Sequence, residues 1–186
     1  MLILTHYCLK TKILFGWIKV NNTNINYTVV QSTNNNYYLN HAFDKSYNKS
    51  GSIFADYKNN FEDFNQNTII YGHNRRNGTM FSALNSTLEE TWYTQLENQF
   101  INFNTLSKST VWKIFSIYKD KTTTVSNPIS FSSETDFLNF VSSLKKKSIY
   151  DFNVNVNNHD KILTLYTCGD NISYRVIVHA KLVYEK

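Results

Sequence analysis

Alternating apolar and polar positions recur in short segments along most of this 186-residue chain. A period of two is typical of β-strands with one buried face, and Asn, Ser and Gly residues between the segments favour turns. The absence of a fixed-period repeat argues against a solenoid or propeller, so the pattern predicts a mainly β fold, a closed barrel or a sandwich. The eight predicted strands are residues 16–20, 26–31, 52–57, 67–72, 98–104, 110–119, 161–167 and 174–184.

One segment has helical spacing instead. Residues 134–147 carry apolar side chains three and four positions apart, which predicts an amphipathic helix. Ser132 or Ser133 can cap its start, and Lys145, Lys146 and Lys147 are favourable at its C-terminal end. This helix separates the predicted strands 110–119 and 161–167. A second helical stretch is predicted at 87–97.

The last two predicted strands bring a thiol and a guanidinium to one face of the sheet. Alternate residues in each strand form an apolar row, and if both rows face one core, Cys168 and Arg175 emerge together on the outer face. His179 shares the face of Arg175 but lies about 13 Å down the strand, so we expect it at the surface. The apolar rows are Leu163 and Leu165, then Val176, Val178, Ala180 and Leu182.

A histidine follows another strand end, where the segment 67–72 runs into His73. A Cys and a His far apart in sequence but both at strand ends can meet in space, as nucleophilic cysteine catalysis requires. Taken singly, each residue has a simpler interpretation: Cys168 as a buried small side chain, His73 as a turn residue, and Arg175 as a solvated charge. The three together favour catalysis.

Composition narrows the function further. At 186 residues with 16% aromatics and one proline, the chain is typical of a single packed domain. The charge of +5 is scattered and no nucleic-acid motif is present, so we expect no nucleic-acid partner. No zinc or calcium ligand pattern appears, so no metal or organic cofactor is expected. His6, Lys10 and Lys12 interrupt the only N-terminal apolar run, so no transmembrane anchor is expected in this chain.

Five blocks of residues, taken in order, resemble the class B sortases, the cysteine transpeptidases that attach proteins to the Gram-positive cell wall. The resemblance covers most of the chain. The blocks are Gly16-Trp17-Ile18-Lys19-Val20, Tyr37-Tyr38-Leu39-Asn40-His41, Gly51-Ser52-Ile53-Phe54-Ala55-Asp56-Tyr57, Tyr71-Gly72-His73-Asn74 with Gly78-Thr79-Met80-Phe81, and Lys161-Ile162-Leu163-Thr164-Leu165-Tyr166-Thr167-Cys168 with Arg175.

The resemblance implies a sortase-type closed eight-stranded β-barrel, with a helix inserted between the last strands and short peripheral helices. It implies a catalytic domain at 16–186. Residues 1–15 then form an atypical or truncated start, because the family normally has an N-terminal membrane anchor. The implied location is the outer face of a Gram-positive membrane, with membrane association only through an anchor that this chain lacks.

The implied reaction cleaves a C-terminal sorting signal resembling Asn-Pro-Gln-Thr-Asn after its Thr. Cys168 attacks the Thr carbonyl to form a thioester, and an amine of the peptidoglycan cross-bridge resolves it. His73 serves as acid and base, and Arg175 binds the carbonyl oxygen. The partners are surface proteins that carry the signal. A pilin polymerase and a non-catalytic barrel that binds peptide or cell-wall material remain alternatives.

Several further residues are candidates around this chemistry. Asp170 is read as an exposed loop carboxylate, although a triad with His73 is conceivable, and Cys8 as an incidental free thiol. The family usually has Ser where this chain has Tyr166, so its peptide preference can differ. For each aromatic candidate, core packing is the competing interpretation. The predicted substrate contacts are Leu39, Tyr71, Ile149, Tyr150, Tyr166 and Thr167.

Overall fold

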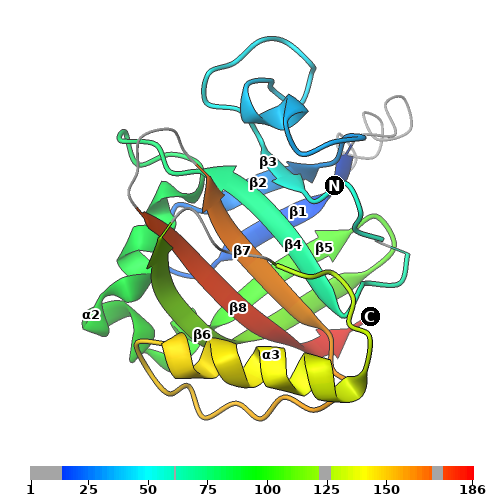
Figure 1. Cartoon of the computed structure of the whole chain (residues 1–186). Coiled ribbons are helices and arrows are strands. Elements are labelled where there is room, and N and C mark those ends of the chain that lie inside the picture. Colours follow the sequence, from blue (N-terminus) through cyan, green and yellow to red (C-terminus); the bar gives the residue numbers. More distant parts are fainter. Residues whose placement is uncertain (1–13, 61, 122–126, 169–173) are drawn as a thin grey trace.

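The computed structural model describes residues 14–60, 62–121, 127–168 and 174–186. Eight strands close into a barrel in the order β1-β2-β3-β4-β7-β8-β6-β5 (Figure 1). The pairs β2/β3 and β4/β7 are parallel, and the other neighbours are antiparallel. The strands are β1 Leu14–Val20, β2 Asn26–Val30, β3 Ile53–Ala55, β4 Asn67–His73, β5 Phe100–Thr105, β6 Ser109–Lys121, β7 Ile162–Cys168 and β8 Tyr174–Glu185.

The alternation in the sequence located every strand to within a few residues at each end. The inserted helix is also confirmed: α3 spans Glu134–Lys147 between β6 and β7, and the Ser133 hydroxyl caps it by accepting from the Asp136 N–H at 3.1 Å. The second helical prediction is right only in part. That region is divided into the 3₁₀ helix η2 (Phe81–Leu88), the short α2 (Glu90–Tyr93) and η3 (Leu96–Gln99). A further 3₁₀ turn, η1, spans Tyr37–Leu39.

The apolar rows of β7 and β8 face the barrel interior, as predicted. Side chains of η2 pack against the same interior face of β4, where the Phe81 ring lies against Gly72. Phe81 and Leu84 are completely buried there. Cys168 therefore points to the outside of the barrel, on the side that also carries α3.

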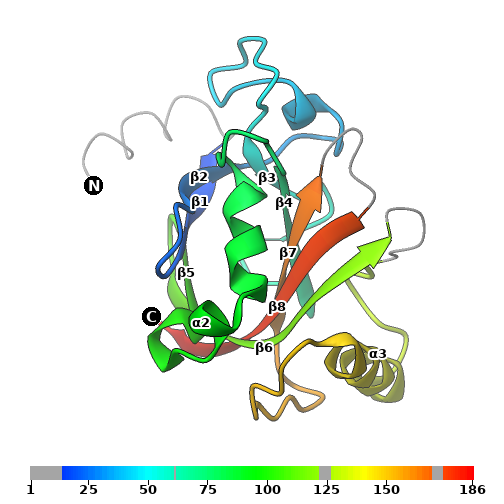
Figure 2. The ribbon, with the colours of Figure 1, turned by 90° about the vertical axis from the view of Figure 1, so that its left-hand side faces the viewer.

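The outer face of β6 and β8 is covered by α3 (Figures 1 and 2). The Ser116 hydroxyl on β6 donates to the Leu144 carbonyl of α3 at 2.8 Å. The covering helix buries His179 completely, so the expectation of a surface histidine is wrong. Strand periodicity gives the face of a residue, but it does not show which part of that face a distant helix will cover.

His179 belongs to a buried hydrogen-bond chain that crosses the strands. The Thr164 hydroxyl donates to Asn67 Oδ1 at 2.7 Å and therefore accepts from His179 Nδ1–H at 2.9 Å. His179 Nε2 is then free of hydrogen and accepts from the Tyr118 hydroxyl at 3.2 Å. Burial, with a smaller contribution from Lys147, lowers the pKa of His179 to about 3. The imidazole is neutral and structural.

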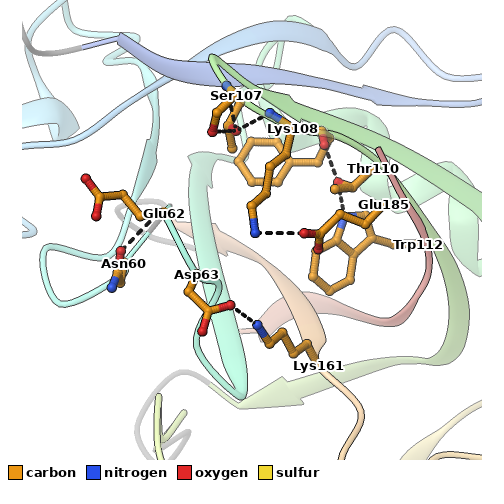
Figure 3. Close-up of polar contacts among 11 residues, drawn as sticks. Asn60, Glu62, Asp63, Ser107, Lys108, Thr110, Trp112, Lys161 and Glu185 are labelled. Carbon is orange, nitrogen blue, oxygen red and sulfur yellow. Dashed lines mark hydrogen bonds and ion pairs between the residues drawn. The ribbon is translucent and has the colours of Figure 1, made fainter.

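Polar contacts close the barrel end where β4 and β7 begin (Figure 3). Lys161, directly before β7, pairs with Asp63, and Lys108 pairs with Glu185 at the end of β8 at 2.7 Å. Nearby, the Trp112 indole donates to the Thr110 hydroxyl at 2.7 Å. These contacts lie at the opposite end of β4 and β7 from His73 and Cys168, so they hold the strands without crowding the candidate site.

The N-terminal prediction lies mostly outside the described residues. Leu14 and Phe15 begin β1, and residues 1–13, including Cys8, are not described. Among the helices of the described ranges, none has both the length and the apolar character that crossing a membrane requires.

Candidate active site

Three adjacent strands carry the three candidate catalytic residues. In the parallel pairing of β4 with β7, His73 is the direct partner of Cys168. In the antiparallel pairing of β7 with β8, Tyr166 is opposite Ile177. Arg175 lies two residues before Ile177, close enough for its charge to act on Cys168. Paired residues point to the same side of a sheet, so all three side chains share the outer face. Cys168 lies between the imidazole and the guanidinium.

His73 is held in one orientation by the chain that precedes β3. Its Nε2 lies 2.5 Å from the Leu39 carbonyl oxygen, and because a carbonyl only accepts, Nε2 carries the hydrogen. Nδ1 is then the ring nitrogen that can exchange a proton. His73 is only 7% exposed, and a Cβ added at Gly51 would lie 3.0 Å from its Cδ2. Leu39 and Gly51 therefore fix the ring from one side.

Cys168 is a free, partly exposed thiol at the end of β7. Burial raises the pKa of this thiol to about 12, and the positive charge of Arg175 acts in the opposite direction. The expected effect of a neighbouring cation is thus present, but desolvation outweighs it. The raised pKa favours the protonated form of the thiol at neutral pH.

Two tyrosines form a wall beside the thiol. Tyr71 and Tyr166 are direct partners on β4 and β7, with ring centroids 5.7 Å apart in an edge-to-face arrangement. The Tyr71 hydroxyl donates to Asp56 Oδ2 at 3.0 Å. Burial raises the pKa of Tyr166, while the charge of Arg175 and its hydrogen bond to Tyr166 oppose that shift. The two packed tyrosines therefore lie between Asp56, which Tyr71 contacts, and Arg175, which Tyr166 contacts.

A pocket of about 730 Å³ lies over the thiol. It brings together four of the predicted site residues: Leu39, His73, Cys168 and Arg175. Thr167 is completely buried on the other face of β7, where its hydroxyl accepts from the Val176 N–H at 2.9 Å, so its side chain does not reach the pocket. Asp170 lies outside the described residues.

Ile149 and Tyr150 follow α3, as predicted, but line a different hollow. That pocket of about 410 Å³ is bounded by the end of α3 and by Phe115. The Tyr150 ring packs on Tyr93 with centroids 4.9 Å apart. Neither residue is among those that line the pocket at Cys168.

Sequence reasoning missed five residues of the Cys168 pocket. Two are cationic, Lys49 and Arg75, and the Arg75 Nη1 donates to the Lys49 carbonyl at 3.0 Å. Arg75 follows His73 by two positions. Its place directly after the end of β4 is the one local feature of the sequence that could have indicated it as a pocket residue. The others come from the connection between β2 and β3, which has no hydropathy period to follow: Asn36, Asn40 and Tyr47.

Comparison with known proteins decides the family. A model described as the sortase domain matches residues 18–183. The chain belongs to the sortase family. Sortase B of Staphylococcus aureus (strain NCTC 8325 / PS 47) is 37% identical over 177 residues, covering 92% of this chain and 71% of that protein. Sortase B of Listeria monocytogenes is 34% identical over 180 residues, with 92% and 70% covered.

Solved class B sortase structures have the same fold. A S. aureus sortase B–substrate complex superposes with a TM-score of 0.90 at 34% identity, covering 96% of this chain and 83% of that one. Clostridium perfringens sortase B gives a TM-score of 0.89 at 33% identity, covering 97% and 99%. The predicted barrel is confirmed, and this class B sortase is a cysteine transpeptidase.

Proposed function

We propose that this sortase cleaves a C-terminal sorting signal resembling Asn-Pro-Gln-Thr-Asn after its Thr and transfers the acyl group to a peptidoglycan amine. The observation that carries the proposal is the position of Cys168 between His73 and Arg175 on three adjacent strands. A thiol, a proton-exchanging imidazole and a fixed cation are the groups that acyl transfer through a thioester needs.

In the first half-reaction, the sulfur of Cys168 attacks the Thr carbonyl carbon. His73 Nδ1 takes the thiol proton as the C–S bond forms and then gives it to the leaving amine as the C–N bond breaks. Arg175 binds the carbonyl oxygen, whose negative charge grows in the tetrahedral state. The product is a thioester on Cys168, and the part of the signal after Thr departs.

In the second half-reaction, an acceptor amine attacks the thioester carbonyl. His73 Nδ1 takes the amine proton, the C–N bond forms, the C–S bond breaks, and the sulfur of Cys168 recovers a proton. The net result exchanges one amide for another, so no external energy source or cofactor is needed. Water in place of the amine gives hydrolysis.

The tyrosine wall supports a role in holding the signal. Tyr71 and Tyr166 share the face of Cys168. They precede His73 and Cys168 by two residues in β4 and β7, so their rings offer aromatic surface next to the thiol. Leu39 lines the pocket beyond His73. Ile149 and Tyr150 remain candidates for a more distant part of the signal, because they line a separate hollow. We place the reaction at the outer face of a Gram-positive membrane, where signal-bearing surface proteins and peptidoglycan meet.

The test is a library of quenched fluorescent peptides of the form Asn-Pro-X-Thr-X, incubated with and without amine acceptors. We expect cleavage after Thr and, with an amine, an adduct on the Thr carbonyl identified by mass spectrometry. Cys168→Ala should abolish both. Cys8→Ser is the matched thiol control and should keep the activity. Cleavage that survives Cys168→Ala, or no turnover of any peptide by the folded reduced protein, would contradict the proposal.

A further inference from the structure

The described lining of the pocket over Cys168 is cationic. Lys49, Arg75 and Arg175 all line it, and no Asp or Glu occurs among its described lining residues. Positive groups gathered around one cavity create a potential that attracts negatively charged ligands. In the proposed reaction Arg175 binds the carbonyl oxygen of the signal. That reaction gives no role to Lys49 and Arg75, so we ask which ligand these two cations could bind.

Lys49 and Arg75 lie on one particular side of the thiol. In the strand order β3-β4-β7-β8, His73 and Arg175 flank Cys168 from opposite sides. Arg75 continues the chain beyond His73, and its Nη1 donates to the Lys49 carbonyl at 3.0 Å. The backbone at Gly51, two residues after Lys49, packs on the His73 ring. Both cations are therefore on the His73 side of the thiol.

The His73 side is where amines enter and leave. The imidazole exchanges protons with the leaving amine and then with the acceptor amine, so both must approach it, whereas the carbonyl oxygen turns toward Arg175. Whatever is attached to the acceptor nitrogen then extends past His73 toward Lys49 and Arg75. An anionic substituent on the acceptor would meet both cations.

We propose that Lys49 and Arg75 form an anion subsite that binds a carboxylate carried by the amine acceptor. The inference rests on the proposed transfer function and adds the acceptor's chemical class. One guanidinium nitrogen of Arg75 is held by the Lys49 carbonyl, which orients the planar group and leaves other N–H donors for a carboxylate. The ammonium of Lys49 adds a second positive charge to the same pocket.

The first test needs neither substrate nor turnover. In a Cys8→Ser background, Cys168 is alkylated with anionic iodoacetate and with neutral iodoacetamide, and the two rates are compared as a ratio. The double variant Lys49→Gln/Arg75→Gln should lower the iodoacetate-to-iodoacetamide ratio by about fivefold, and the effect should shrink in high salt. The control Arg76→Gln, an exposed neighbouring cation outside the pocket, should keep the ratio. An unchanged ratio in the double variant would overturn the subsite.

The second test identifies the source of the carboxylate. Transfer from an Asn-Pro-Gln-Thr-Asn donor is measured with triglycine and with triglycinamide, which differ only in the charged end. We expect kcat/KM for triglycine to exceed that for triglycinamide about tenfold, and the preference to vanish in the double variant but not in Arg76→Gln. Equal use of both acceptors would overturn the acceptor assignment.

A parallel arm replaces the residue after Thr in the donor with Asp. A charge preference confined to this leaving segment, with none for the acceptor, would assign the subsite to the departing peptide and refute our assignment. Absence of all turnover would instead contradict the proposed function, and the alkylation ratio would then decide the anion subsite by itself.

Discussion

Cys168 and His73 are direct partners across β7 and β4, and the Asn74 N–H donates to the Cys168 carbonyl at 2.7 Å directly beyond them. The parallel ladder thus continues to the last residue of each strand, and the two side chains leave the sheet side by side. A register slip of one residue would turn the thiol into the barrel interior. The strand pairing itself is therefore part of the geometry of the candidate active site.

Gly51→Ala should impair catalysis through His73. Gly51 has φ +61°, and an added Cβ would meet the Tyr38 and Leu39 carbonyl oxygens at 2.5 and 2.7 Å. Since the Leu39 carbonyl holds His73 Nε2, moving it should misorient the ring. We expect kcat/KM for peptide cleavage to fall at least tenfold, and the free energy of unfolding to fall by about 2 kcal/mol from backbone strain and crowding.

The matched control is Gly78→Ala. Gly78 also has a positive φ, +79°, but an added Cβ would meet no atom within 4 Å. This variant should lose only about 1 kcal/mol of stability and keep its cleavage kinetics. Equal kinetic losses in the two variants would show that backbone strain, not displacement of the Leu39 carbonyl, is responsible.

The reactivity of Cys168 should have an unusual pH dependence. Because burial raises the pKa of the thiol to about 12, alkylation of the Cys8→Ser protein by iodoacetamide should rise about tenfold per pH unit from 7 to 10 without a plateau. Arg175 opposes this shift, so Arg175→Gln should slow alkylation further at every pH in that range. The ordinary pKa of a free thiol is about 8.5. A rate that levels off near that pH would contradict a raised pKa for Cys168.

Substitutions of Tyr71 and Tyr166 should separate an effect on the stability of the fold from an effect on the positioning of Arg175. Tyr71→Phe removes the hydroxyl that donates to the buried Asp56, which should cost about 1–2 kcal/mol of unfolding free energy. Tyr166→Phe keeps the edge-to-face ring contact but loses the hydrogen bond with Arg175. It should lower kcat for peptide cleavage several-fold with a stability change below about 1 kcal/mol. Denaturant unfolding and steady-state kinetics on both variants would check the two roles.

The sequence predicts much of this molecule because its local rules and its fold agree. Alternation in β7 and β8 assigns Leu163 and Val178 to the interior, and consequently Cys168 and Arg175 to the outside. The α3 helix begins and ends where its apolar spacing, its Ser133 cap and its terminal lysines predict. In each case the signal lies within a few residues of the element that it specifies.

Other features depend on contacts between distant segments, which no local pattern records. His179 is buried because α3 crosses its strand, and Lys49 reaches the pocket because an irregular connection folds over His73. The rise in the pKa of Cys168 has the same origin, since the desolvation of a group depends on everything packed around it. The sequence therefore predicts candidate reacting residues but not the environment that the fold gives them.

Acid should destabilise the fold through His179. With a folded-state pKa of about 3 and an unfolded value of about 6.5, the unfolded chain binds a proton in this range that the native protein excludes. The stabilising contribution is therefore complete above pH 6.5 and is lost as the pH falls toward 3, at up to about 1.4 kcal/mol per pH unit.

His179→Gln should be less stable at pH 7, because it breaks the hydrogen bonds that link Thr164 to Tyr118, yet its unfolding free energy should decline less steeply in acid. His159→Gln, at an exposed imidazole, is the matched control and should retain the wild-type slope in denaturant titrations from pH 7 to 4. Parallel slopes for wild type and His179→Gln would mean that another buried group controls the acid limb.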